Sequence, residues 1–131
     1  MKLDKKSSDD WKKDWERAKN FLTAAENNLK LNDYKTAANR AYFTAESAVV
    51  AALKLNFKPT SKIHKNIWTY SKLLGLEIDT FSLLRDLYDL RLQADYGNSS
   101  EIIELTSETL NDYMAQVKEL CNMLKLKSKL E

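Results

Sequence analysis

The chain has 131 residues, 44% of them hydrophobic and 31% charged, which predicts one compact domain over residues 1–131 with an ordered core over about 9–126. Its 21 Lys and Arg against 19 Asp and Glu give a net charge of only +2, which excludes the strongly basic overall surface typical of nucleic-acid-binding domains. Only two Gly and one Pro occur, and β-rich folds need such residues at their many turns, so we expect an all-α fold.

The sequence supports neither a membrane-spanning protein nor a metal-binding protein. The longest unbroken apolar run, residues 48–53, is far shorter than the ~20 residues that a membrane span needs, and no apolar stretch follows the charged start. We therefore expect a soluble, cytoplasmic protein. Cys121 has no second Cys and no His near it in the sequence, so we expect no metal or cofactor and interpret it as a small buried apolar residue.

The first two predicted helices form a hairpin. The first is expected to begin at an N-cap, Ser7 or Ser8, and to run to about residue 31, and the second runs from 34 to about 55 with Asp33 as its N-cap. Helical spacing gives the first a stripe of Trp11, Trp15, Ala18, Leu22, Ala25 and Leu29, and the second a stripe of Tyr34, Ala38, Ala41, Ala45, Ala48 and Ala52. Small residues allow close approach, so the second helix is predicted to be the centre of an up-and-down bundle of four to five helices.

Three further helices are expected. Pro59 ends the second helix, and Thr60 or Ser61 caps a shorter third one that runs to residue 74 and stops at Gly75. Asp79 or Thr80 caps a fourth helix over about 81–95, and residues 96–100 form a turn. The last helix is predicted from 101 to about 126, with an apolar stripe of Ile103, Thr106, Leu110, Tyr113, Val117, Leu120 and Leu124.

Charged residues interrupt the apolar face of the fourth helix. At 100° per residue, Arg91 and Asp95 fall inside an apolar arc that includes Phe81 and Tyr88. Buried charges require partners, so two interpretations remain. Either Arg91 and Asp95 pair and fix the following turn, or Arg91 opens onto a groove and binds a phosphate with its planar fork.

Arg40 and His64 are weaker candidates. Arg40 lies at the edge of the alanine stripe, where it either extends along the core surface or assists phosphate binding. His64 is the only histidine and is interpreted either as a surface residue or as a group that titrates near neutrality. No Gly-rich phosphate loop, G-x-S-x-G or H-E-x-x-H motif occurs, so phosphate-loop hydrolysis, hydrolase triads and zinc chemistry lose their usual support.

The order of these segments resembles a known family. Asn39-Arg40-Ala41-Tyr42-Phe43 on an alanine-rich helix, then a Pro59-Thr60 break and an R-x-x-A-D-Y segment at 91–96, is similar to the small HEPN-domain proteins of bacteria and archaea. The resemblance implies a helical bundle that forms a homodimer, with the ends of the R-x-x-A-D-Y helices lining a cleft between protomers.

The resemblance implies only part of the family's active site in this chain. Many members are metal-independent ribonucleases, often toxins paired with a minimal nucleotidyltransferase, and their active site is an arginine followed four to six residues later by histidine. Arg91 matches that arginine, but Tyr96, Gly97 and Asn98 stand where the histidine would be. Phenol and amide groups are poor proton acceptors near neutral pH.

The sequence and the resemblance therefore favour a non-catalytic or weakly catalytic protein that binds RNA or a nucleotide, as one component of a toxin–antitoxin-like pair with a minimal nucleotidyltransferase. Arg91 and Arg40 are its expected phosphate ligands. One alternative is an endoribonuclease that uses Arg91 with Asp95 or Tyr96 in place of histidine. A second alternative is a purely structural interaction module.

Overall fold

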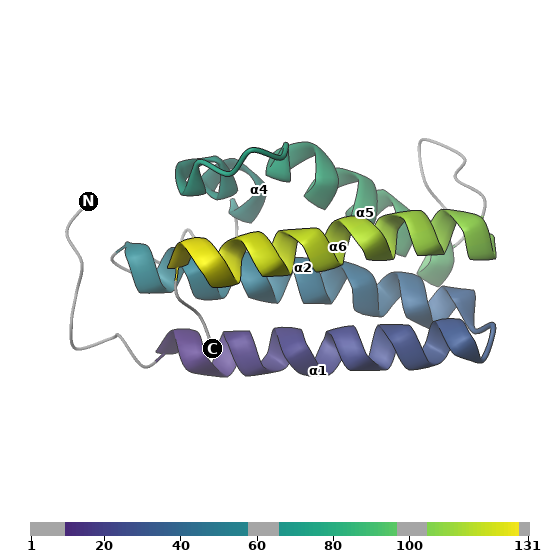
Figure 1. The fold of residues 1–131 in the computed structure, drawn as a ribbon. Coiled ribbons are helices and arrows are strands. Elements are labelled where there is room, and N and C mark those ends of the chain that lie inside the picture. Colours follow the sequence, from purple (N-terminus) through teal and green to yellow (C-terminus); the bar gives the residue numbers. More distant parts are fainter. Residues whose placement is uncertain (1–9, 58–65, 97–104, 129–131) are drawn as a thin grey trace.

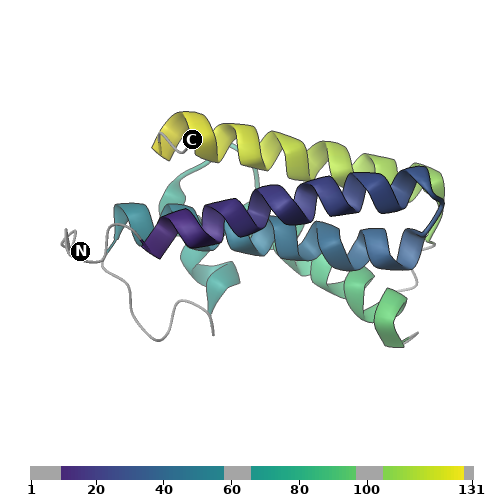
Figure 2. The same cartoon turned by 90° about the horizontal axis from the view of Figure 1, so that it is seen from below.

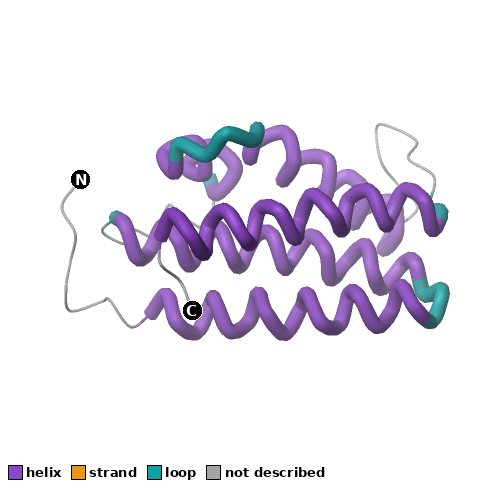
Figure 3. Tube along the Cα trace, viewed as in Figure 1, coloured by secondary structure: helices purple, strands orange, loops and turns teal. Residues whose placement is uncertain are grey.

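Three long helices, α1 (Asp10–Lys30), α2 (Tyr34–Asn56) and α6 (Ser107–Ser128), run alongside one another, and α5 (Thr80–Tyr96) crosses α2 obliquely (Figures 1 and 2). Between α2 and α5 the chain forms α4 (Ile67–Tyr70) and a 3-10 helix, η2 (Ser71–Leu74). The computed structural model describes residues 10–57, 66–96 and 105–128, and every regular element in these ranges is helical (Figure 3). The predicted all-α bundle is confirmed.

The α2 helix is the centre of the bundle, as its small residues predicted. It packs against α1, α5 and α6, and its side chains are buried on several faces rather than along one stripe. Residues with no exposed surface include Ala38, Ala41, Ala45, Ala48 and Ala52. Trp15, Ala18 and Ala25 of the predicted stripe on α1 are also buried, while Trp11, Leu22 and Leu29 are partly buried against the same core. Alanines on α2 thus let the bulkier side chains of its neighbours approach closely.

The hairpin between α1 and α2 closes with local hydrogen bonds. Asn32 adopts a left-handed conformation with φ of 60°, which an asparagine tolerates. Asp33 then caps α2 as predicted, because its side chain accepts a hydrogen bond of 3.3 Å from the backbone N–H of Thr36. Ser7 and Ser8, the predicted caps of the first helix, lie outside the described residues.

A buried ion pair joins these two helices, and the sequence patterns did not predict it. Asp14 on α1 is only 5% exposed, and its Oδ2 lies 2.8 Å from Nζ of Lys54 on α2. Arg17 Nη1 approaches the other carboxylate oxygen at 3.6 Å. A buried carboxylate needs such compensation, and the pair provides it through a contact between the two helices.

The prediction of one continuous third helix ending at Leu74 is wrong in its later part. Asn66 has φ of −124° and ψ of 36°, so α4 begins only at Ile67, and the last turn before Gly75 is a 3-10 helix. Gly75 does end the element as predicted, with φ of 61°. Thr60 and Ser61 lie outside the described residues.

The C-terminal end of α5 and the N-terminal end of α6 differ from the prediction. Asp79 caps α5, accepting from the N–H of Ser82 at 3.0 Å, but the helix includes Tyr96, where a turn had been expected. The start predicted for the last helix at residue 101 is wrong, because Leu105 and Thr106 are not helical. The Thr106 hydroxyl accepts a hydrogen bond from the Thr109 N–H, which makes it an N-cap rather than part of the stripe.

None of the described helices combines the length and the apolar character needed to cross a lipid bilayer.

Candidate functional site

The charged pair predicted on the fourth helix lies where α5 crosses α2. Arg91 Nε is 3.4 Å from Asp95 Oδ2, one turn further along α5. The same carboxylate oxygen accepts a hydrogen bond of 3.0 Å from Nδ2 of Asn39 on α2. The Arg91 and Asp95 side chains are 20% and 27% exposed, so both charges sit at the rim of the core. The pairing that the sequence suggested is therefore present, and Asn39 ties it to the central helix.

Aromatic rings hold the Arg91 guanidinium in place. Its central carbon lies 4.9 Å from the ring centroid of Phe43, 5.8 Å from that of Tyr88 and 5.9 Å from that of Tyr42. Ring faces carry negative potential and attract a guanidinium. Nε is buried without an aligned hydrogen bond, so its contact with Asp95 acts as an ion pair. The guanidinium is thus positioned by its charge and by the aromatic rings around it.

Arg40 joins this group from α2. Its Nη1 donates a hydrogen bond to Oδ1 of Asn39, whose amide nitrogen in turn donates to Asp95. Polar contacts therefore run without interruption from Arg40 through Asn39 and Asp95 to Arg91. These four residues are called the Arg91 cluster below. Two arginines and one carboxylate give it a net positive charge.

Two other predicted candidates are not placed by the structure. Tyr96 is the last residue of α5, but its side chain lies outside what is described. His64 also lies outside the described residues.

A pocket of about 530 Å³ opens along the same seam between α2 and α5. Tyr42 and Tyr88, whose rings face Arg91 on one side, also line this pocket. We call it the aromatic pocket; its lining is Tyr42, Glu46, Asn66, Ile67, Trp68, Thr69, Phe81 and Tyr88. The rings of Trp68 and Tyr88 meet edge to face at 5.2 Å, and those of Trp68 and Phe81 at 6.0 Å. The seam therefore offers a cation and an aromatic cavity side by side.

A short hydrogen-bond chain crosses the pocket. The indole N–H of Trp68 donates to the Tyr42 hydroxyl at 3.4 Å, and that hydroxyl donates to Oε2 of Glu46 at 2.7 Å. Burial, followed by the neighbouring Glu46 carboxylate, raises the pKa of Tyr42 above its usual value. The phenol thus remains a donor at every physiological pH and holds Glu46 in a fixed orientation.

Sequence reasoning missed the aromatic pocket and the part played by Asn39. Tyr42 and Glu46 are four residues apart on one helix, which was the only local sign that they could interact. Trp68 and Phe81 belong to other elements, so their approach depends on how α4 and α5 pack against α2.

Within the described ranges, no three His, Cys, Asp or Glu side chains lie close enough together to bind a metal ion. Cys121 is partly buried as a free thiol against the core, and this burial raises its pKa to about 11.

Comparison with known proteins agrees with this architecture. No curated protein matches the chain at a significant level of sequence similarity. The model of the HEPN domain family matches residues 11–127, which include every described helix that builds the Arg91 cluster and the aromatic pocket. The chain therefore belongs to the HEPN domain family.

Proposed function

We propose that this HEPN protein binds RNA or a nucleotide through the Arg91 cluster, cleaves RNA slowly or not at all, and works with a protein partner. Membership of the family supports the general role. The resemblance of the 91–96 segment to members of toxin–antitoxin pairs favours a minimal nucleotidyltransferase as that partner.

The arrangement of Arg91 is the observation that carries the proposal. Three aromatic rings and Asp95 hold its guanidinium at the rim of the core, and its Nε–H has no aligned acceptor among the described residues. A phosphate supplies two or more acceptor oxygens in the geometry of the fork. Because the side chain is already held, little conformational entropy is lost when a phosphate binds.

Weak catalysis follows from the groups around that fork. The chain has no histidine at positions 96 to 98, and the Asp95 oxygen nearest Arg91 already accepts a hydrogen bond from Asn39. General acid–base assistance typically contributes ~10²–10⁴-fold in rate. A bound RNA would therefore be oriented by Arg91 without efficient proton transfer.

The test measures binding and cleavage of labelled single-stranded RNA by the wild type, Arg91→Ala and Arg85→Ala. Arg85 is the matched control, because it lies on α5 but is half exposed, and its one ion pair within the described residues is with its neighbour Asp86. A charge-assisted contact contributes about 1.5–3 kcal/mol, so Arg91→Ala should weaken binding by roughly 10- to 150-fold. Arg85→Ala should weaken it less than about 3-fold, and binding should fall as salt rises.

Other results would redirect the assignment. If Arg91→Ala lowers thermal stability sharply while RNA affinity stays unchanged, the cluster is structural. Rapid cleavage by the wild type that Arg91→Ala abolishes would instead establish the endoribonuclease, with Asp95 and Tyr96 as the next residues to substitute. The partner is tested separately, by identifying the protein and the RNA that copurify from the native host.

A further inference from the structure

The aromatic pocket contains the carboxylate of Glu46, which accepts one hydrogen bond from the described residues. Glu46 is half-buried, and Oε2 accepts from Tyr42. Within the described part of the chain Glu46 has no Lys or Arg partner within 4.0 Å, and no further hydrogen bond to it is present. A carboxylate accepts about four hydrogen bonds, so a ligand with N–H donors would be bound favourably here.

The walls of the pocket suit a flat ring. Trp68, Phe81 and Tyr88 all line it and come from two elements, α4 and α5. Nucleobases stack on such side chains, and this stacking is itself nearly independent of base identity. The volume of about 530 Å³ admits a bicyclic base.

Glu46 supplies the selectivity that stacking lacks. Guanine presents two adjacent donors on one edge, N1–H and the N2 amino group, which a carboxylate can accept together. Adenine and cytosine offer one amino group, and uracil offers one N–H between two carbonyl oxygens that a carboxylate repels. Asn66 also lines the pocket, and its amide can donate to the guanine O6 atom.

The position of Arg91 relative to the pocket matches the layout of a nucleotide. Tyr42 and Tyr88 separate the two, with the guanidinium carbon 5.8 Å from the Tyr88 ring centroid. Tyr88 and Arg91 are three residues apart on α5, a rise of about 4.5 Å. A base in the pocket and a 5′-phosphate on Arg91 would thus lie on either side of these two residues, with the ribose between them.

We propose that the aromatic pocket binds the guanine base of a nucleotide or of an RNA residue whose phosphate contacts Arg91. This inference rests on the proposed function, because Arg91 supplies the phosphate contact. Glu46 is the specificity-determining residue, and Tyr42 positions its carboxylate.

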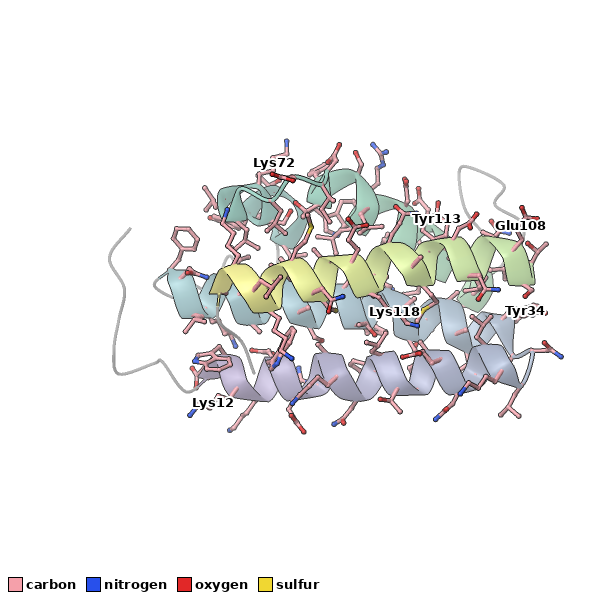
Figure 4. All side chains as sticks on the ribbon, viewed as in Figure 1. Lys12, Tyr34, Lys72, Glu108, Tyr113 and Lys118 are labelled. Carbon is pink, nitrogen blue, oxygen red and sulfur yellow. The ribbon has the colours of Figure 1, made fainter. Side chains whose placement is uncertain are left out.

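The experiment is equilibrium titration of GMP, AMP, CMP, UMP and guanosine into the wild type, Glu46→Gln, Arg91→Ala and the control Glu26→Gln. Glu26 on α1 pairs with Lys118 on α6, and neither residue lines the aromatic pocket. In Figure 4 Lys118 lies well apart from Lys72 of η2. The wild type should bind GMP roughly 10-fold or more tightly than UMP. Glu46→Gln should reduce that ratio to about 3 or less without weakening UMP, whereas Glu26→Gln should leave it unchanged.

Comparing nucleotides with guanosine, which has no phosphate, separates phosphate binding by Arg91 from guanine binding in the aromatic pocket. Arg91→Ala should weaken all four nucleotides by a similar factor and leave guanosine binding unchanged. Guanosine binding that depends on Glu46, together with nucleotide binding insensitive to Arg91, would overturn the phosphate role and support the base pocket. Equal affinities for the four nucleotides, or a GMP preference that survives Glu46→Gln, would overturn the guanine proposal. So would a Glu46-dependent affinity for tetramethylammonium without one for GMP, which would make the pocket a cation site.

Discussion

At the residue scale, Tyr42 connects the two halves of the candidate site. Its ring lies beside the Arg91 guanidinium, and its hydroxyl both accepts from Trp68 and donates to Glu46. Tyr42→Phe would leave the indole N–H and the carboxylate without that partner. We expect it to lower the free energy of unfolding by about 1–2 kcal/mol, measured by chemical denaturation.

Tyr34→Phe is the matched control for this substitution. The Tyr34 hydroxyl donates to Asn32 at 3.3 Å in an exposed position, at the turn between α1 and α2 (Figure 4). Its removal should change stability by less than about 0.5 kcal/mol. Equal effects of the two substitutions would show that the buried hydrogen-bond chain contributes nothing to folding.

At the scale of the element, the N-cap of α5 makes the stability of the helix that carries Arg91 dependent on pH. Asp79 accepts from both the backbone N–H and the hydroxyl of Ser82, and these bonds lower its pKa below the ordinary 3.8. A carboxyl whose pKa is lower in the folded state contributes stability above its unfolded pKa, and this contribution disappears as pH falls through the folded value.

The corresponding experiment compares the melting temperatures of the wild type and Asp79→Asn between about pH 6 and pH 2. Asparagine still caps a helix but cannot ionise in this range, so the variant should lose less stability on acidification. All other carboxyl groups are common to both proteins and cancel in the comparison. Identical pH profiles would mean that the charge of Asp79 does not stabilise the cap.

At the scale of the whole molecule, we expect two chains to associate through α5. The Arg91 cluster places two arginines and a carboxylate at the rim of the core, where a second protomer could complete their contacts. The resemblance to dimeric HEPN proteins gives the same expectation. Sedimentation equilibrium at micromolar concentration should show a species of twice 15.2 kDa. Detection of the 15.2 kDa species alone would contradict a stable dimer.

The sequence by itself determined the helical class, the central place of α2 and the caps at Asp33 and Gly75, and it narrowed the cap of α5 to Asp79 or Thr80. These features depend on residues within one or two turns of each other, such as the Ser82 amide that Asp79 accepts from. Periodicity and capping depend on neighbouring residues in the chain, so they can be predicted from a single sequence. The pairing of Arg91 with Asp95 could be suggested from the sequence because the two residues are four positions apart on one helix.

Only the tertiary structure decided what surrounds that pair. Asn39 and Asp95 are 56 residues apart in the chain, and Trp68 meets Tyr42 and Phe81 from a separate short helix. Contacts of this kind depend on the angle at which α5 crosses α2 and on the late start of α4 at Ile67. Such packing depends on many side chains at once, and no local sequence pattern specifies it. The pocket beside Arg91 could therefore be identified only from the tertiary structure.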